Sequence, residues 1–111
     1  MDTITWQDFE KVEIREGMVL SAEPFPEARK PAYKLTIDFG PLGVRQTSAQ
    51  ITANYKFKKL LGRQVLAVTN FPPKWIAGFR SEVLVLGAVP GEGDVVLVKP
   101  DENVPDGTRV L

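Results

Sequence analysis

Alternating apolar and polar positions predict that this chain is built mainly from short β-strands. The clearest strand is YKLTIDFG, residues 33–40, whose apolar side chains share one face: Tyr33, Leu35, Ile37 and Phe39. The turn sequence Gly-Pro-Leu-Gly leads from it into residues 44–51, VRQTSAQI, which we expect to be its hairpin partner. The low apolar content of this partner predicts that much of it is exposed.

Other segments have strand composition but differ in how regularly their apolar residues recur. Residues 12–22, VEIREGMVLSA, alternate at first and are then interrupted by Gly17, which predicts a bulge or bend. RQVLAVTNF (63–71) and EVLVLGAV (82–89) are almost continuously apolar, as in strands packed on both faces. GDVVLVKPD (93–101) is a further strand, and the tail NVPDGTRVL has a Pro-Asp-Gly turn before a last extended piece.

Two short helices are predicted outside the strands. The first contains Trp6, Phe9 and Val12 at a helical spacing, with Thr3 or Thr5 as the N-cap. The second is NYKFKKLLG, residues 54–62, with Thr52 or Asn54 as its cap and Gly62 as its stop.

The order of these elements predicts the fold class. A helix between the third and fourth strands is the arrangement of the OB-fold, a small Greek-key barrel. We therefore expect an all-β fold, a five-stranded OB-fold barrel with short helices and additional terminal strands, forming one domain over residues 1–111. Such barrels bind ligands across the face of their second and third strands. That face is expected to carry these polar side chains: Lys34, Thr36, Arg45 and Ser48.

Composition argues against an enzyme. The chain has no cysteine and no histidine, so disulfides, thiolate metal sites and catalysis by Ser-His or Cys-His pairs are excluded. The Gly-x-x-Gly at Gly40 to Gly43 fits a hairpin turn and not a phosphate loop, and Asp101 and Glu102 are expected to be solvated. We expect no catalytic residue, no cofactor and no metal site.

The chain has neither a basic start followed by an apolar core nor an apolar run near the roughly twenty residues that a membrane span needs. We therefore expect a cytoplasmic protein without membrane insertion.

Charge is segregated along the chain although the formal net charge is zero. Residues 1–28 carry seven acids and two bases, residues 29–80 one acid and ten bases, and residues 81–111 six acids and two bases. The basic middle segment predicts a polyanionic or acidic partner, unless folding mixes the three segments so that they neutralise one another.

The stretch NFPPKWIAGFRSEVLVLG, residues 70–87, combines large aromatic residues with cations ahead of an apolar strand. Aromatic side chains beside cations suit stacking on bases or gripping peptide side chains. Packing at the end of the barrel is the simpler interpretation of Trp75 or Phe79 taken alone, but the group as a whole favours a binding surface. From these residues we expect a peptide-binding set, Phe71, Trp75 and Phe79.

The chain resembles a known family over nearly its whole length. EIREGMVLSAE, YKLTIDFG, the Ser48-Ala49-Gln50 step, NFPPKWIAGFRSEVLVLG and VPDGTRV are similar to the tRNA-binding domain of some methionyl- and phenylalanyl-tRNA synthetases, and most similar to the CsaA family of export-related chaperones. This resemblance implies a homodimer associated through its terminal segments. It also implies pockets for unfolded precursor polypeptides and a link to the ATPase of the secretory translocase.

The resemblance also bears on tRNA binding as the alternative function. Asn70, Lys74 and the Ser81-Glu82 step match the tRNA-binding relatives, whereas the loop FPEARK lacks the histidine of their motif and is not carried over. Phosphate contacts would make tRNA affinity fall steeply with salt. The expected nucleic-acid-binding set is Lys34, Arg45, Ser48, Asn70, Lys74, Arg80 and Ser81.

Overall fold

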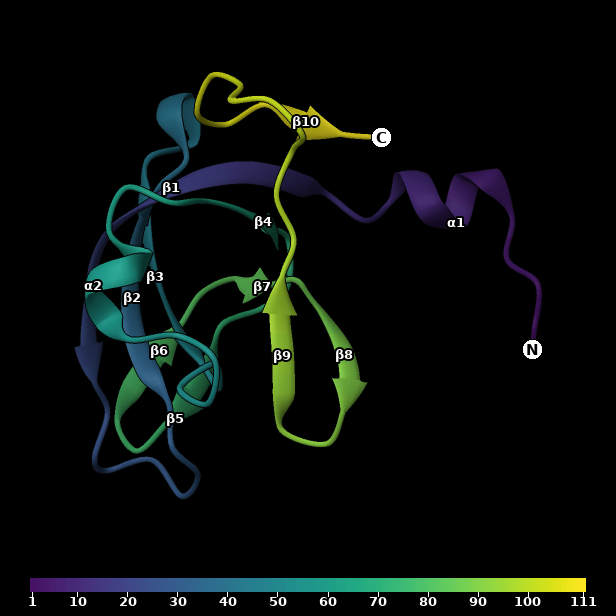
Figure 1. Ribbon diagram of the computed structural model, residues 1–111. Helices are drawn as coiled ribbons and strands as arrows, with labels where there is room; N and C mark the ends of the chain where they lie inside the picture. Colours follow the sequence, from purple (N-terminus) through teal and green to yellow (C-terminus); the bar gives the residue numbers. More distant parts are fainter.

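A computed structural model describes all residues from Met1 to Leu111 and contains a nearly closed barrel of five antiparallel strands (Figure 1). In their order across the sheet the strands are β3 (Val44–Ala49), β2 (Tyr33–Asp38), β1 (Ile14–Pro24), β4 (Gln64–Val68) and β7 (Leu84–Val85). β1 is long enough to pair with β2 along one part and with β4 along another. The predicted all-β OB-fold barrel is therefore confirmed.

Smaller elements surround the barrel. They are α1 (Trp6–Glu10), the 3-10 turn η1 (Gly40–Leu42), α2 (Phe57–Leu60), β5 (Lys74–Ile76), β6 (Phe79–Ser81), β8 (Gly87–Gly91), β9 (Asp94–Leu97) and β10 (Arg109–Val110). β5 and β6 form one hairpin, β8 and β9 form a second, and β10 pairs with β1. The additional strands predicted towards the C-terminus are present. None of the helices has the length and apolar character needed to cross a membrane.

The barrel is filled by the side chains that the alternating pattern assigns to one face of β2. Leu35, Ile37 and Phe39 are almost completely buried. Gly17 on β1 lies against them, and a Cβ atom there would sit 2.5 Å from Ile37 Cγ2 and 2.6 Å from Phe39 Cε1. The glycine is thus required for core packing. The bulge predicted at Gly17 is wrong, because the register of β1 shifts between Val19 and Ser21.

Side chains close the barrel between β3 and the residues after β6. Thr47 is fully buried, and its hydroxyl donates to the Val83 carbonyl (2.6 Å) and lies 3.0 Å from the Ser81 hydroxyl. Glu82 makes two hydrogen bonds with the backbone of Gln46. Its N–H donates to the Gln46 carbonyl (2.9 Å), and its carboxylate accepts from the Gln46 N–H (3.0 Å). The expectation that much of this strand is exposed is wrong, since the seam buries its alternate side chains.

Two predicted elements are shorter than their sequence patterns. α2 is a single turn whose N-cap position is Lys56, with no side-chain hydrogen bond, so the caps predicted at Thr52 and Asn54 are wrong. Asn54 instead binds the β9 hairpin by donating to the Val95 carbonyl (3.0 Å). The apolar run 82–89 is divided between β7 and β8, because the chain leaves the barrel and enters the second hairpin there.

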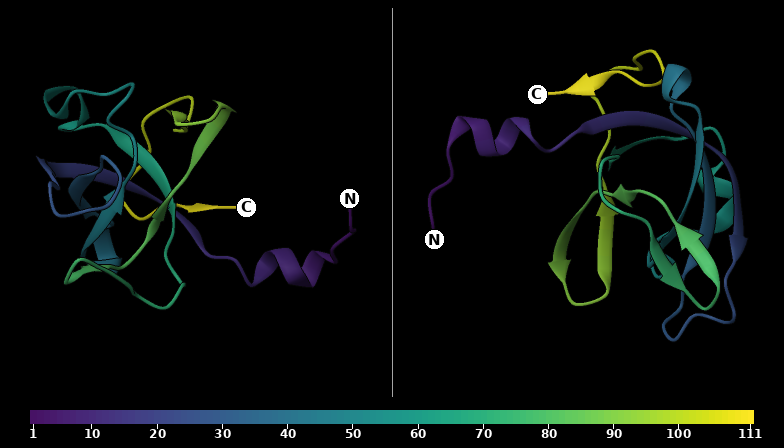
Figure 2. Two further views of the ribbon diagram at one scale, coloured as in Figure 1. Left: turned by 90° about the horizontal axis from the view of Figure 1, so that it is seen from below. Right: turned by 180° about the vertical axis from the view of Figure 1, so that it is seen from behind.

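α1 stands clear of the barrel, and both chain ends lie on the same side of the molecule (Figures 1 and 2). The cap is Thr5, one of the two predicted, and its hydroxyl accepts from the Asp8 N–H (3.0 Å) while the Asp8 carboxylate accepts from the Thr5 N–H (3.1 Å). The helix ends at Glu10, so Val12 lies outside it, contrary to the predicted spacing. No residue of α1 is buried, and 70% of Trp6 is exposed. The apolar spacing that predicts this helix therefore leaves its apolar side chains without a covering surface in the single chain.

A buried carboxyl group holds the C-terminal turn against β1. Glu16 is fully buried, its Oε1 accepts from the Gly107 N–H (3.2 Å), and its Oε2 has no hydrogen-bond partner. Burial, followed by the neighbouring Asp106 and, to a smaller extent, Asp38, raises the pKa of Glu16 from 4.5 to about 7, although the hydrogen bond from Gly107 acts in the opposite direction. Backbone hydrogen bonds also hold the turn, since the Gly107 N–H donates to the Glu16 carbonyl (3.0 Å) and the Glu16 N–H donates to the Thr108 carbonyl (2.8 Å).

Candidate binding groove

A groove of about 550 Å³ lies beside the barrel seam. One wall is the end of β3 and the residues after it, 48–51, and the opposite wall is formed by residues 81–85. Phe71 and the hairpin β5–β6 border it on another side. Most of the lining side chains are apolar, including Ile51, Ile76 and Val83, so the groove suits apolar side chains of a ligand.

Four of the residues predicted for binding line this groove, namely Ser48, Phe71, Lys74 and Ser81. The Ser81 hydroxyl is already engaged, because it accepts from the Ser48 N–H (3.1 Å) and contacts the Thr47 hydroxyl. Phe71 and Lys74 are exposed and have no such structural contact. They are the predicted side chains that remain available to a ligand in the groove.

The hairpin β5–β6 divides the other predicted residues between two faces. Lys74 lies opposite Ser81 and Trp75 lies opposite Arg80 in its register. Because successive side chains of a strand alternate, Trp75 and Arg80 share the face that does not line the groove. Trp75 is 67% exposed, and Arg80 is also exposed. The structure thus separates Trp75 from Phe71, although both are predicted for peptide binding.

Phe79 and Lys34, predicted for two different ligands, pack together. The Phe79 ring meets the buried Phe25 ring edge-on, with centroids 5.4 Å apart. Lys34 Nζ lies 4.7 Å from the Phe25 centroid and 5.2 Å from that of Phe79. A cation at this position is attracted to the ring faces. The end-of-barrel packing considered for Phe79 is therefore what the structure shows.

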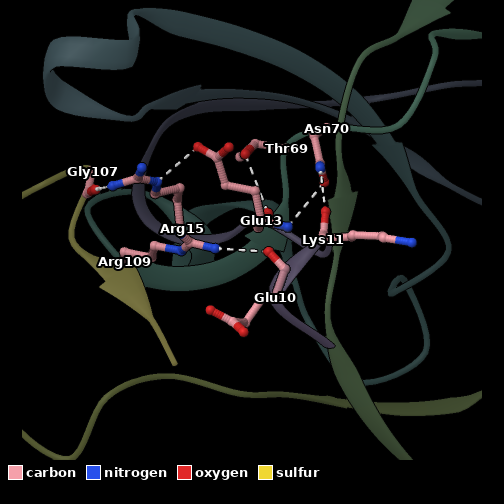
Figure 3. A network of polar contacts seen from close by, with 8 residues as sticks. All are labelled: Glu10, Lys11, Glu13, Arg15, Thr69, Asn70, Gly107 and Arg109. Carbon is pink, nitrogen blue, oxygen red and sulfur yellow. Dashed lines mark hydrogen bonds and ion pairs between the residues drawn. The ribbon is translucent and has the colours of Figure 1, made fainter. Parts of the chain in front are cut away.

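Asn70 is held in a network that fixes the approach of α1 to the barrel (Figure 3). Its Oδ1 accepts from the Glu13 N–H (3.0 Å), and its Nδ2 donates to the Lys11 carbonyl (2.7 Å). In the same network Arg15 donates to the Gly107 carbonyl (3.1 Å) and Arg109 to the Glu10 carbonyl (3.1 Å). The side-chain amide of Asn70 is thus engaged by backbone groups at both of its polar atoms.

Arg45 does not share the face predicted for it. Lys34 lies opposite Ser48 in the β2–β3 register, whereas Arg45 lies opposite the buried Ile37. Arg45 therefore belongs to the inward-facing series of β3, near the end of the barrel. The prediction fails because the sequence does not fix which residues of the exposed-looking strand 44–51 face inwards.

The basic middle segment is not neutralised by ion pairs. Of the ten bases in residues 29–80, only Arg80 has an acidic partner, Glu82 at 4.0 Å. The other two ion pairs, Lys11 with Asp8 and Arg15 with Glu13, are local contacts near the N-terminus. Arg80 with Glu82 is therefore the one direct ion pair that joins the basic segment to an acidic one.

Sequence reasoning missed several groove residues. Gln50 enters the sequence analysis only through the hairpin partner and the Ser48-Ala49-Gln50 resemblance, and Ile51 only through the hairpin partner. Ile76 follows Trp75 directly but is not predicted for binding. Glu82 was expected only by resemblance, yet it contacts the β3 backbone. The usable signal was the apolar pair Ala49 and Ile51 at alternate positions, which indicates a strand end facing an apolar environment.

A five-stranded OB-type barrel with an apolar groove beside its seam is an architecture that serves binding. The model of the putative tRNA binding domain family matches residues 14–109, and the chain belongs to this family.

The relatives include methionine–tRNA ligases and CsaA chaperones. The chain is 43% identical to the methionine–tRNA ligase of Rhodopirellula baltica over 109 residues, which cover 98% of the chain but only 16% of the ligase. Among solved structures, the chaperone CsaA of Bacillus anthracis is similar with a TM-score of 0.96 and 53% identity, covering 99% of this chain and 100% of that one. The CsaA chaperone protein of Picrophilus torridus has a TM-score of 0.91 and 47% identity, covering 98% and 100%.

Proposed function

We propose that this chain is a molecular chaperone that binds unfolded precursor polypeptides on their way to export. The observation that carries the proposal is the groove, whose apolar walls are open to solvent beside a barrel that is otherwise well packed. The likeness to two CsaA chaperone structures over almost the entire chain supports it. The chain would act by binding alone, without turnover of a substrate.

The composition of the groove favours tolerance for many sequences. Apolar contact is not directional, so a groove lined mainly by aliphatic and aromatic side chains accepts different residues with similar affinity. Ser81 and Glu82 lie in the groove, but their polar atoms are already bonded to Ser48 and Gln46. Few groups are left to demand a particular ligand side chain, which is what a chaperone for diverse precursors needs.

The proposed chaperone acts in the cytoplasm as a homodimer, and the secretory translocase ATPase is its proposed partner. The projecting α1 supports the dimer, because Ile4 and Trp6 are 69% and 70% exposed on a segment that stands clear of the barrel. Burying such side chains against a second copy would remove apolar surface from water.

The alternative function is tRNA binding, and a different surface favours it. Trp75 and Arg80 lie side by side on the outer face of the hairpin, where an aromatic ring and a cation suit a base and a phosphate. The unpaired bases of residues 29–80 provide further positive charge. Family membership supports this alternative as well.

Fluorescence anisotropy of a labelled, unfolded segment of a secreted precursor tests the main proposal. The segment is titrated with the protein, with and without excess tRNA, at about 50 mM and about 200 mM salt. We expect binding that survives both tRNA and the higher salt, because apolar contact is little affected by ions. Absence of peptide binding, together with tight and salt-sensitive binding of tRNA, would overturn the chaperone proposal in favour of the alternative.

Matched phenylalanine variants locate the site. Phe71→Ala removes an exposed ring that lines the groove, whereas Phe57→Ala removes an exposed ring on α2 outside it. We expect Phe71→Ala to weaken peptide binding by about tenfold and Phe57→Ala to leave it unchanged. Trp75→Ala combined with Arg80→Ala should lower tRNA affinity and leave peptide affinity unaltered, because these residues face away from the groove.

A further inference from the structure

The groove follows an unpaired edge of the barrel sheet. β3 and β7 are the two ends of the path of paired strands, so each has a hydrogen-bonded neighbour on one side only. The groove lies between the end of β3 and the segment that contains β7. An unpaired strand edge presents backbone donors and acceptors to whatever lies beside it.

Side chains occupy the first part of the β3 edge. The Gln46 N–H donates to the Glu82 carboxylate (3.0 Å), and the Ser48 N–H donates to the Ser81 hydroxyl (3.1 Å). Residues 46 and 48 are alternate positions, and in a strand alternate residues direct their backbone groups to the same edge. A carboxylate and a hydroxyl thus take the place of a neighbouring strand for the two N–H groups, while the Gln46 carbonyl accepts from the Glu82 N–H (2.9 Å).

The backbone groups of the next residue in this series, Gln50, have no hydrogen-bond partner. Gln50 lines the groove, it is exposed, and neither its N–H nor its carbonyl has a hydrogen-bond partner in the chain. Ala49 and Ile51, on either side of it, are buried and hold this backbone against the core. The free donor and acceptor are therefore fixed in place before a ligand arrives, which lowers the entropic cost of binding.

We infer that the groove takes its polypeptide as an added β-strand, which pairs with the β3 edge at Gln50 while its alternate side chains enter the apolar groove. This inference rests on the proposed chaperone function and names how that ligand is recognised. Strand addition draws affinity from main-chain hydrogen bonds, which every sequence offers, and leaves only the alternate side chains to be selected. The occupant is thus an extended and unfolded segment, not a helix.

Charge at the groove specifies the occupant further. Lys74 lines the groove and has no acid within ion-pair distance, whereas Glu82 is engaged by the Gln46 N–H and by Arg80 at 4.0 Å. The charge left available to a ligand is therefore positive. An extended segment with an aspartate or glutamate among its apolar residues complements the groove better than one with a lysine.

Backbone-modified peptides test this mode of binding. The probe is a labelled peptide of alternating valine and threonine with one central glutamate, and two versions carry N-methyl groups on alternate backbone nitrogens, one in each register. Strand addition to a single edge uses the N–H groups of one register only. We expect one methylated version to bind about tenfold more weakly than the parent peptide and the other to bind like the parent.

A pair of protein variants gives an independent readout. Gln50→Pro removes the backbone donor at the β3 edge, and Gln50→Ala keeps it. We expect Gln50→Pro to weaken binding of the parent peptide by about fivefold and Gln50→Ala to leave it unchanged. Circular dichroism and thermal unfolding establish that both variants are folded.

The outcomes separate this inference from the proposed function. If the parent peptide binds and both methylated versions bind equally well, or equally poorly, the chain grips side chains and strand addition is wrong, while the chaperone function stands. Equal affinities of Gln50→Pro and Gln50→Ala for the parent peptide would likewise show that strand addition is wrong, while the chaperone function stands. If neither the parent peptide nor an unfolded precursor segment binds, the proposed function itself fails.

Discussion

Lys34 and Phe79, which sequence reasoning assigns to nucleic acid and to peptide respectively, contact each other, with Lys34 Nζ 5.2 Å from the centroid of the Phe79 ring. The buried Phe25 ring completes the cluster. The three residues come from β2, β6 and the loop before β2, so their contact attaches the hairpin β5–β6 to the barrel. A residue that looks like a phosphate contact in the sequence therefore stabilises one wall of the groove.

Loss of the Lys34 contact should destabilise the protein. Lys34→Ala should lower the free energy of unfolding by about 1 kcal/mol, because the cation–π contacts are lost. Urea unfolding measures the change. Lys30→Ala is the matched control, since Lys30 is exposed and contacts no ring, and it should have almost no effect. Equal effects of the two substitutions would contradict the structural role of Lys34.

Stability should fall as the pH rises, because Glu16 has a folded-state pKa of about 7 against 4.5 in its ordinary environment. An acid whose pKa is raised by folding contributes its full stability below about pH 4.5, and this contribution is lost as the pH rises through about 7. Burial is the main cause, followed by Asp106. Glu16→Gln should therefore remove the decline and raise stability at about pH 8, by up to about 3 kcal/mol.

Urea unfolding of both proteins at about pH 5 and about pH 8 measures this difference. Asp101→Asn is the control for loss of one acidic charge, because Asp101 is exposed. A decline with pH that persists unchanged in Glu16→Gln would show that another group is responsible.

The two hydrogen bonds of Asn70 to the backbone of Lys11 and Glu13, here called the clamp, should control the motion of the segment between α1 and β1. Asn70→Ala removes the acceptor of the Glu13 N–H and the donor to the Lys11 carbonyl, so we expect hydrogen exchange of the Glu13 amide to accelerate by about tenfold. Asn70→Asp keeps the acceptor and should preserve most of the protection. If Asn70→Ala leaves this exchange unchanged, the contact is not a clamp.

The proposed homodimer should depend on the exposed side chains of α1. Trp6→Ala should shift sedimentation velocity from a dimer towards a monomer, with dimer affinity reduced at least about tenfold, because a large apolar side chain is lost from the contact. Trp75→Ala is the matched control, since it removes an equally exposed tryptophan from a different face. A monomeric parent protein, or a dimer insensitive to Trp6→Ala, would refute this arrangement.

The sequence predicts the barrel better than it predicts the binding surface, for a physical reason. Core positions such as Ile37 and Phe39 are specified by alternation, and the Thr5 cap by local hydrogen-bonding chemistry, so both appear where expected. Which side chains gather at the groove depends instead on the register between β3 and its neighbours. Arg45 is an example, because a shift of the alternation of β3 by one residue moves its side chain from the outer face of the sheet to the inner face.

Local composition also fails to predict the role of a polar residue when its hydrogen-bond partners are distant in the sequence. Asn70 and Ser81 have the polarity expected of a binding site, but their partners, Glu13 and Thr47, are distant in the sequence. Gln50 is not among the residues predicted for binding, because the feature that distinguishes it is an absence of backbone pairing. No pattern of residue types reports that absence.

The seam between β3 and the residues after β6 gives the barrel a separable closure. A continuous ladder of backbone hydrogen bonds is nearly independent of side-chain identity, whereas this seam has one backbone hydrogen bond, from Glu82 to Gln46, and otherwise relies on side chains. These side chains are Thr47, Ser81, Glu82 and Gln46. Evolution can therefore tighten or loosen the mouth of the groove by single substitutions at Thr47, Ser81 or Glu82 without altering the four ladders that define the fold. The mouth of the groove is therefore set by a few side chains, whereas the pairing of the barrel strands is set by the backbone.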